Sequence, residues 1–183
     1  DLGTSNVYRV GVSINEIVAE KMPVSLRLGL TALCISLCLG LSLGIVMARS
    51  TRTRFKIGDR LGTVFIVVIQ ALPSAVYHIL IQFIGSQSDF GKSIGLKMLY
   101  EQGEIMTYVL PLISLSIGNI AYYAMWLRRY MVDEANKDYI RLARSKGVPS
   151  GRISRSHVFR NAFFPLVQYI PNSILFTLMC SLY

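Results

Sequence analysis

LGLTALCISLCLGLSLGIVMA occupies residues 28–48 and contains no Asp, Glu, Lys or Arg. Charged side chains are also absent from residues 61–88, 105–127 and 161–183. Each run is longer than the roughly 18 apolar residues that mark a helix crossing a bilayer. We therefore predict an all-α, polytopic transmembrane bundle with about four spans, at residues 25–48, 61–84, 106–127 and 162–183.

The composition of the whole chain agrees with a membrane protein. Hydrophobic residues make up 52% of the 183 residues and charged residues only 16%, and the mean hydropathy is +0.47. Soluble domains carry about 25% charged residues. The chain begins at Asp1 without an initiator Met and stops at Tyr183 within an apolar run, so we expect it to be a fragment of a larger bundle.

Basic residues are distributed unevenly between the predicted loops. Residues 49–60 hold five Lys and Arg, residues 85–107 hold two, and residues 128–160 hold nine. Cytoplasmic loops of membrane proteins carry the excess of basic residues. We therefore predict that 49–60 and 128–160 are cytoplasmic and that 85–105 faces outward. This topology accounts for the net charge of +9 without nucleic-acid binding.

The first predicted span carries small residues at every fourth position. They are Ala32, Ser36, Gly40, Gly44 and Ala48. Such a stripe allows another backbone to approach closely. Packing inside one bundle is the more common use of this pattern, and association of two subunits is the alternative.

A short helix is predicted before the first span. Ser13 and Glu16 have the spacing of a capping box, which starts a helix. Pro23 is expected to end it. The segment is either an amphipathic helix at the outer membrane surface or an ordinary connecting helix.

Polar side chains in the second predicted span also recur every four residues, at Gln70, Ser74, His78 and Gln82. This spacing places them on one face of a helix, which Pro73 is expected to kink. Polar groups at membrane depth normally face the bundle interior or a wet cavity. We predict that this face lines a translocation pathway, together with residues of the third span, Ser116, Asn119 and Tyr123. Hydrogen bonding between helices is the alternative.

Neither a metal site nor a catalytic centre is predicted. Cys34, Cys38 and Cys180 fall within predicted spans, where cysteine behaves as a small apolar side chain, and no further metal ligands are near. His78 and His157 are the only histidines and belong to different predicted compartments. Paired carboxylates within the spans and an H-E-x-x-H pattern are also absent.

The loop at 128–160 has the pattern of a helix, a glycine turn and a second helix. Ala135, Tyr139, Leu142 and Ala143 share one face of the first predicted helix, and Gly147 and Pro149 stop it. A second helix is predicted from about Ser150. An amphipathic, basic helical pair of this kind can fit a groove on a soluble partner.

The same loop resembles that of the permease subunits of dipeptide and oligopeptide ABC importers. Their pattern is D-Y-[IV]-R-x-A-R-[AS]-K-G, nine residues, then H-x-[LF]-R-N-A-x-x-P. Residues 138–147 read DYIRLARSKG and residues 157–165 read HVFRNAFFP. The general EAA-loop consensus of ABC permeases ends in Leu-Pro where this chain has Phe159-Arg160, a departure typical of the peptide branch.

The resemblance implies a type I ABC importer permease of a bacterial inner membrane, with spans beyond both ends of this chain. It implies that the loop docks on and couples to an ATPase through Tyr139, Arg141, Ala143, Arg144, Lys146, Gly147, His157, Arg160 and Asn161. The implied partners are a second permease subunit, two ABC ATPases that bind ATP and Mg²⁺, and an extracytoplasmic peptide-binding protein. Peptide is the implied solute, with nickel or another small solute as the alternative.

A competing interpretation is a membrane-tethered DNA-binding protein, because residues 141–155 also mimic a helix-turn-helix. Such a module needs further helices to bury its core. Only some 33 residues separate the predicted spans, so we expect no nucleic-acid partner.

Overall fold

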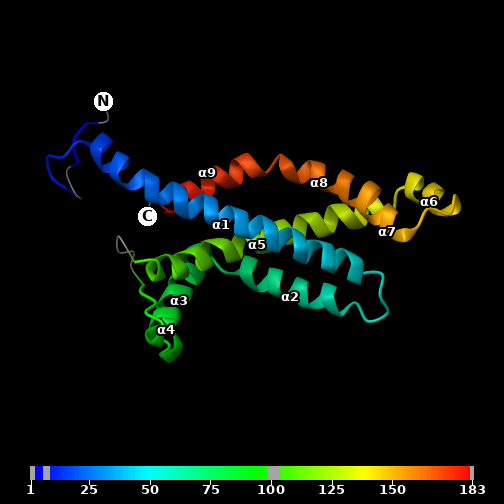
Figure 1. The fold of residues 1–183 in the computed structure, drawn as a ribbon, viewed down its shortest axis with the longest axis horizontal. Coiled ribbons are helices and arrows are strands. Elements are labelled where there is room, and N and C mark those ends of the chain that lie inside the picture. The colour runs from blue at the N-terminus through cyan, green and yellow to red at the C-terminus, as the bar shows by residue number, and fades with distance from the viewer. Residues whose placement is uncertain (1–2, 6–8, 99–103, 182–183) are drawn as a thin grey trace.

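The computed structural model describes residues 3–5, 9–98 and 104–181, and in this part of the chain every regular element is helical. Two long helices, α1 (Ile14–Ser50) and α5 (Met106–Ala135), run side by side in the same direction (Figure 1). The other described helices are α2 (Ile57–Ala71), α3 (Ser74–Gln87), α4 (Asp89–Ser93), α6 (Asp138–Ser145), α7 (Ser150–Arg152), the π-helical segment η1 (Ile153–Phe159), α8 (Arg160–Val167) and α9 (Ile170–Ser181). Of these, α2, α3, η1, α8 and α9 contact the pair directly, whereas α4 packs on α3, and α6 and α7 pack on η1.

The small residues of α1 form its contact with α5. All five members of the predicted stripe are buried. A Cβ added to Gly40 would lie 2.9 Å from Cβ of Tyr123, and one added to Gly44 would lie 3.0 Å from the Ala124 carbonyl oxygen. Ser36 donates a hydrogen bond to the Ser116 carbonyl across the interface, at 3.2 Å. The stripe therefore serves packing inside this bundle.

Pro23 does not end a separate helix, as the sequence had suggested. Residues 14–50 form one continuous helix with Pro23 inside it. A proline removes one backbone hydrogen bond, and a long membrane helix tolerates this loss. Pro111 likewise lies within α5 without interrupting it.

The predicted span at 61–84 is bent more sharply than the kink expected at Pro73. The helix ends at Ala71 and resumes at Ser74, and the two halves, α2 and α3, are bent by 103°. Leu72 is extended (φ −92°, ψ 135°), because the ring of Pro73 disfavours a helical conformation for the preceding residue. The bend turns α3 away from the line of α2 (Figure 1), and α3 still packs against α5, where Gln82 Nε2 donates to the Ser114 hydroxyl.

The predicted fourth span at 162–183 also consists of two helices. α8 ends at Val167 and α9 begins at Ile170. Within the described residues, two helices, α1 and α5, are long and apolar enough to cross a membrane individually, and the bent α2–α3 pair is a possible third span.

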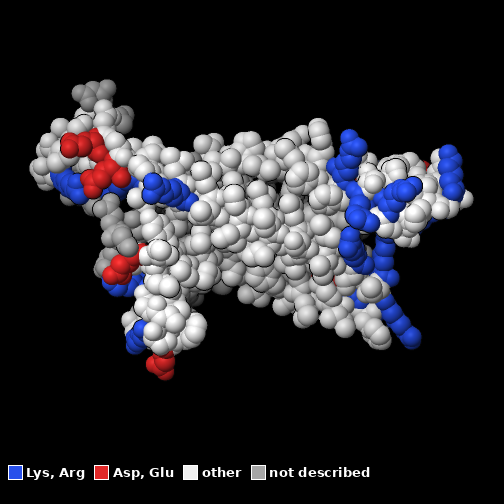
Figure 2. Space-filling view, in the orientation of Figure 1, with Lys and Arg blue, Asp and Glu red and all other residues white. Residues whose placement is uncertain are grey.

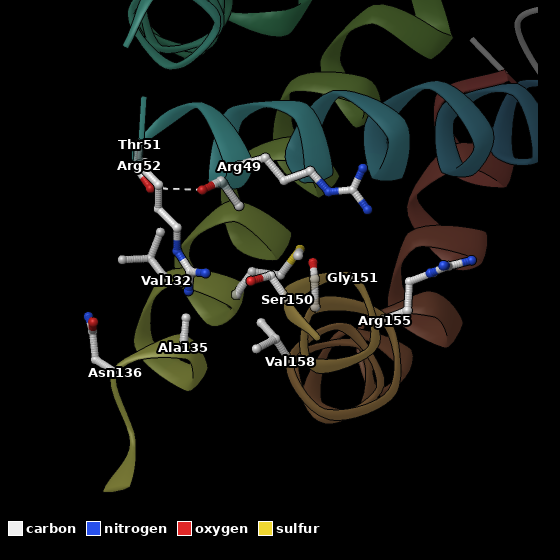
Figure 3. A pocket seen from close by; sticks show the side chains of 13 residues that line it. Arg49, Thr51, Arg52, Val132, Ala135, Asn136, Ser150, Gly151, Arg155 and Val158 are labelled. Atoms are coloured by element: carbon white, nitrogen blue, oxygen red, sulfur yellow. Dashed lines mark hydrogen bonds between the residues drawn. The ribbon is translucent and has the colours of Figure 1, made fainter. Parts of the chain in front are cut away.

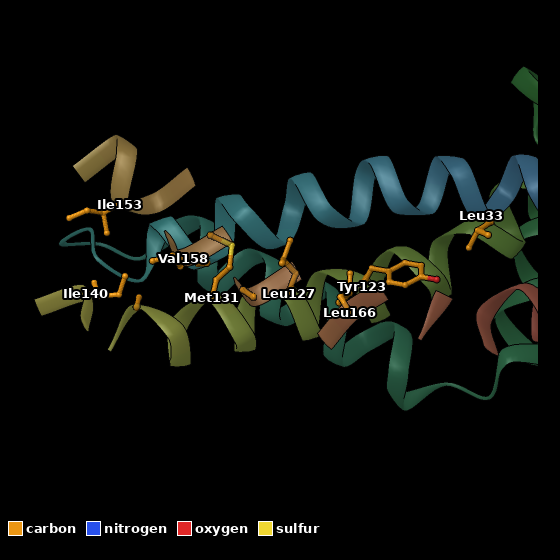
Figure 4. Packing of buried hydrophobic residues seen from close by; sticks show 11 residues of the cluster. Leu33, Tyr123, Leu127, Met131, Ile140, Ile153, Val158 and Leu166 are labelled. Carbon is orange, nitrogen blue, oxygen red and sulfur yellow. The ribbon is translucent and has the colours of Figure 1, made fainter. Parts of the chain in front are cut away.

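The larger of two hydrophobic clusters continues from the long helices into the loop after α5. Figure 4 follows it from Leu33 and Tyr123 through Leu127 and Met131 to Ile140. Ile153, Val158 and Leu166 belong to the same cluster. The loop is therefore built onto the end of α5 as part of the bundle.

Lys and Arg gather at one end of the molecule (Figure 2). This end holds the loop between α1 and α2 and the helices that follow α5 (Figure 1). The two loops that the sequence predicts to be cytoplasmic thus lie at the same end, as that topology requires.

Candidate functional site

The helix-turn-helix at the basic end is closed by Gly147. Gly147 has φ +77°, a left-handed conformation that disfavours residues with a Cβ. Its N–H donates to the Arg144 carbonyl at 3.0 Å, and the Val148 N–H donates to the Ala143 carbonyl at 3.1 Å. These two bonds form a Schellman motif that ends α6. No other group lies within 4 Å of a Cβ placed on Gly147, so its conformation, and not lack of space, requires glycine.

Helix α6 is attached to the bundle by one apolar residue. Ile140 is completely buried and belongs to the core shared with Ile153 and Val158. Ala143 packs beside this core, whereas Leu142 is 55% exposed. The predicted shared face of Tyr139, Leu142 and Ala143 is therefore not one contact surface, because Ile140 sets which side of α6 turns inward.

A carboxylate at the end of α5 joins three elements of the loop. Glu134 is buried, and its carboxylate accepts hydrogen bonds from Tyr139 of α6 and from Asn161 of α8, the latter at 3.3 Å. Asn161 Nδ2 also donates to the Tyr139 hydroxyl at 2.9 Å, and Lys137 Nζ lies 2.6 Å from Glu134 Oε2. We call Glu134, Lys137, Tyr139 and Asn161 the Glu134 network.

The electrostatics keep this network in one protonation state. Burial, followed by the hydrogen bond to the Glu134 carboxylate, raises the pKa of Tyr139 above its ordinary value. The hydrogen bond to Glu134 also raises the pKa of Lys137. Both shifts favour the protonated form, so that Tyr139 and Lys137 act as donors to the Glu134 carboxylate.

The network contains two of the predicted docking residues and two that the prediction missed. Tyr139 and Asn161 were predicted as parts of the contact with the ATPase; here they also connect α6 to α5 and α8, and both keep exposed surface. Glu134 and Lys137 were not singled out. A signal did exist: Glu134 lies seven residues after Leu127 and three after Met131, on the buried face of α5, where a carboxylate needs partners.

The other predicted docking residues lie around α6 and η1. Arg144, Lys146 and Arg160 are exposed, and His157 is half-buried, with the centroid of its ring 6.5 Å from the centroid of the Tyr139 ring. Arg141 is exposed and lies 3.4 Å from the Asp138 carboxylate. The outward side of α6 is therefore an exposed Leu142 surrounded by basic residues.

A second polar contact joins α2 to α5 near the same end. Arg128 Nη2 donates to Asp59 Oδ2 at 2.8 Å, and Arg128 Nε pairs with Oδ1 of the same carboxylate. Asp59 is 9% exposed. This two-bond pairing, 69 residues apart in sequence, fixes the start of α2 on α5.

Comparison with known proteins identifies the family. Residues 40–179 match the family model of the binding-protein-dependent transport system inner membrane component. The chain belongs to this family. The sequence-based recognition and the membrane location are thereby confirmed.

Relatives of this transport-system component carry permease names. The oligopeptide transport system permease protein AmiC of Streptococcus pneumoniae is 35% identical over 147 residues, covering 80% of this chain and 28% of the relative. The permease protein OppB of Salmonella typhimurium is 29% identical over 175 residues, covering 93% and 53% respectively. The chain thus spans about half or less of these relatives.

A solved structure shares the fold. The crystal structure of an amino acid ABC transporter with histidines superposes with a TM-score of 0.67 at 19% identity, covering 94% of this chain and 75% of that one. This similarity confirms the predicted all-α permease fold.

The residues predicted to line a pathway are not brought together as expected. Gln70 and Ser74 are exposed but belong to different helices, because the chain bends between them. His78 and Gln82 are half-buried on α3, and Gln82 Nε2 donates to the Ser114 hydroxyl of α5 at 3.4 Å. The continuous polar line is therefore a wrong prediction.

The third-span residues differ from one another. Ser116 and Tyr123 are 3% and 0% exposed and lie in the α1–α5 contact, so they cannot line a passage in this arrangement. Both residues lie against the small residues of α1. The spacing of those small residues predicted a packing face but did not show that α5 is its partner. Asn119 is half-buried and donates to the Leu115 carbonyl at 3.3 Å.

Metal ligands do not cluster in the part of the chain that the structure describes: no group of three or more His, Cys, Asp or Glu side chains could hold an ion there. Cys34 and Cys38 are exposed on α1, and the Cys180 side chain is outside the described residues.

Proposed function

We propose that this chain is part of the permease subunit of an ABC importer of peptides, and that residues 128–160 couple ATP hydrolysis by separate ATPases to movement of the spans. The observation that carries the proposal is the attachment of α6 to both α5 and α8. Ile140 joins it to the core, and Tyr139 joins it to Glu134 and Asn161. A displacement of α6 would move the ends of both helices.

The outward side of α6 is suited to a protein partner. Leu142 is an exposed apolar residue, with Arg141, Arg144 and Lys146 beside it. Interfaces commonly place an apolar anchor within a polar rim. We infer that Leu142 is the anchor on the ATPase and that Tyr139 and Ala143 hold the helix in place behind it.

Fewer residues are proposed to line the pathway than the sequence pattern indicated. Gln70 at the end of α2, Ser74, His78 and Gln82 on α3 and Asn119 on α5 remain candidates, since they retain exposed surface. The outer face of α2 exposes apolar residues, including Leu61, Val64 and Val68. Lipid and a second permease subunit are the proposed neighbours of this face. An extracytoplasmic binding protein would deliver the solute, and peptide follows from the relatives' names.

The docking surface can be tested with Leu142→Glu in the complete transporter, expressed with its ATPases. We expect normal insertion of the subunit, at least a tenfold loss of co-purified ATPase, since about 1.4 kcal/mol gives a factor of ten, and loss of uptake. Phe55→Glu makes the same chemical change at an exposed apolar residue of the other basic loop and serves as the control. Full ATPase retention by Leu142→Glu would refute the assigned surface.

A further inference from the structure

A cavity of about 760 Å³ lies at the basic end, and Leu142 is not among the residues that line it. Its walls come from the end of α1, the end of α5 and the segment α7–η1 (Figure 3). Met131, Val132 and Val158 give one part of the wall an apolar surface. Cavities with an apolar wall and a few polar groups are typical ligand sites.

The charge on the walls has one sign. Arg49, Arg52 and Arg155 line the cavity, and its lining residues include no Asp or Glu. In Figure 3 the Arg52 side chain reaches into the space between α1 and α5, and the side chains of Arg49 and Arg155 extend toward a common side. Burial, followed by the positive charge of Arg144, lowers the pKa of Arg52. The arginines thus lack a negative partner within the cavity.

The cavity lies at the level where the membrane surface is expected. Ala48, in its wall, is the last residue of the charge-free run, and Arg49 is the first charged residue after it. Phe55 and Ile57 of the following loop are 68% and 60% exposed, and the Arg54 guanidinium lies 5.9 Å from the Phe55 ring. Exposed apolar residues mixed with basic ones suit the boundary between headgroups and acyl chains.

We propose that this cavity binds the phosphate headgroup of an anionic phospholipid from the cytoplasmic leaflet. Arginine forms paired hydrogen bonds with phosphate oxygens, and basic pockets between helices at the cytoplasmic surface recognise such headgroups. The apolar wall at Met131, Val132 and Val158 contacts the glycerol and the first acyl carbons. The proposal rests on the membrane orientation proposed above and is independent of the solute.

A lipid in this position touches the same elements as the coupling loop. Arg52 belongs to the segment after α1, Val132 to α5, and Arg155 to η1. The bound headgroup therefore links α1 to the base of the loop that carries α6. Coupling between ATP hydrolysis and transport accordingly depends on the anionic lipid content of the membrane.

The test uses the complete transporter in nanodiscs containing phosphatidylglycerol and phosphatidylcholine, with the lipids retained after detergent extraction identified by native mass spectrometry. We expect the wild type to retain phosphatidylglycerol. In Arg52→Gln/Arg155→Gln the affinity for this lipid should fall about fivefold for each arginine removed, because each basic residue contributes about 1 kcal/mol. Arg60→Gln/Arg129→Gln removes the same charge outside the cavity and should retain the lipid.

Two further arms distinguish the lipid from other anions. Inorganic phosphate added in excess should not displace the retained phosphatidylglycerol; displacement would show a simple phosphate site and overturn the proposal. ATPase co-purification is measured in the same samples. Unchanged lipid retention in Arg52→Gln/Arg155→Gln, with loss of the ATPase, would assign the cavity to the docking contact and refute the lipid site while leaving the proposed function intact.

Discussion

The α1–α5 pair and the α2–α3 pair have similarly apolar sequences but opposite structural roles. α1 buries nine residues and contacts α5 along its length, whereas α3 buries none. The first pair is brought together by small residues at four-residue spacing, whereas the break before Pro73 turns α3 out of line with α2, so that α3 contacts α5 but not the length of α1. Apolar composition therefore identifies the membrane segments. The small residues determine which helices pack closely along their length, and the proline determines where the chain changes direction.

The largest effect is expected from filling the α1–α5 contact. Gly40→Leu places its side chain where even a Cβ would be 2.9 Å from Tyr123 Cβ. Overpacking of this kind costs about 3 kcal/mol, and unfolding in detergent should occur at a clearly lower temperature. Ala75→Leu, at an exposed position of α3, should leave the unfolding temperature nearly unchanged. Equal losses in both variants would contradict the comparison.

A smaller effect is expected from the polar contacts at the basic end. Glu134→Ala removes the acceptor shared by Tyr139 and Asn161 and should destabilise the loop by about 2 kcal/mol, as for hydrogen bonds to charged groups. Hydrogen exchange in α6 should rise accordingly. Asp133→Ala, one position earlier and exposed, provides the control. If α6 exchanges equally in both variants, the Glu134 network does not hold it.

The smallest effect on stability is expected at Pro73. Pro73→Ala restores a backbone N–H and frees Leu72 to become helical, so the angle between α2 and α3 should open. Spin labels at Val64 and Leu80 would then be farther apart, with a stability change below about 1 kcal/mol. An unchanged label distance would show that packing against α5, and not the proline, sets the bend.

Local sequence signals predicted part of this architecture. The stripe from Ala32 to Ala48 predicted a packing face, and Gly147 predicted the turn, because both depend on spacing or on one residue's conformation. The pairing of Asp59 with Arg128 joins residues 69 positions apart and depends on how α2 lies on α5. Contacts between distant residues also explain why Tyr123 was assigned to a pathway: its spacing did not show that it packs against Gly40 of α1. Pro73 predicted a kink, but its size depends on the contacts of α3.

If α6 moves together with α5 and α8, the distance between α6 and α8 must stay constant while the transporter works. Spin labels would be placed at Asp138 and Phe164, both exposed, after replacement of the native cysteines in the complete transporter. We expect one narrow distance that stays the same without nucleotide and with trapped ATP, and that broadens in Glu134→Ala. A shift of that distance on ATP binding in the wild type would contradict it, because α6 would then move independently of α8.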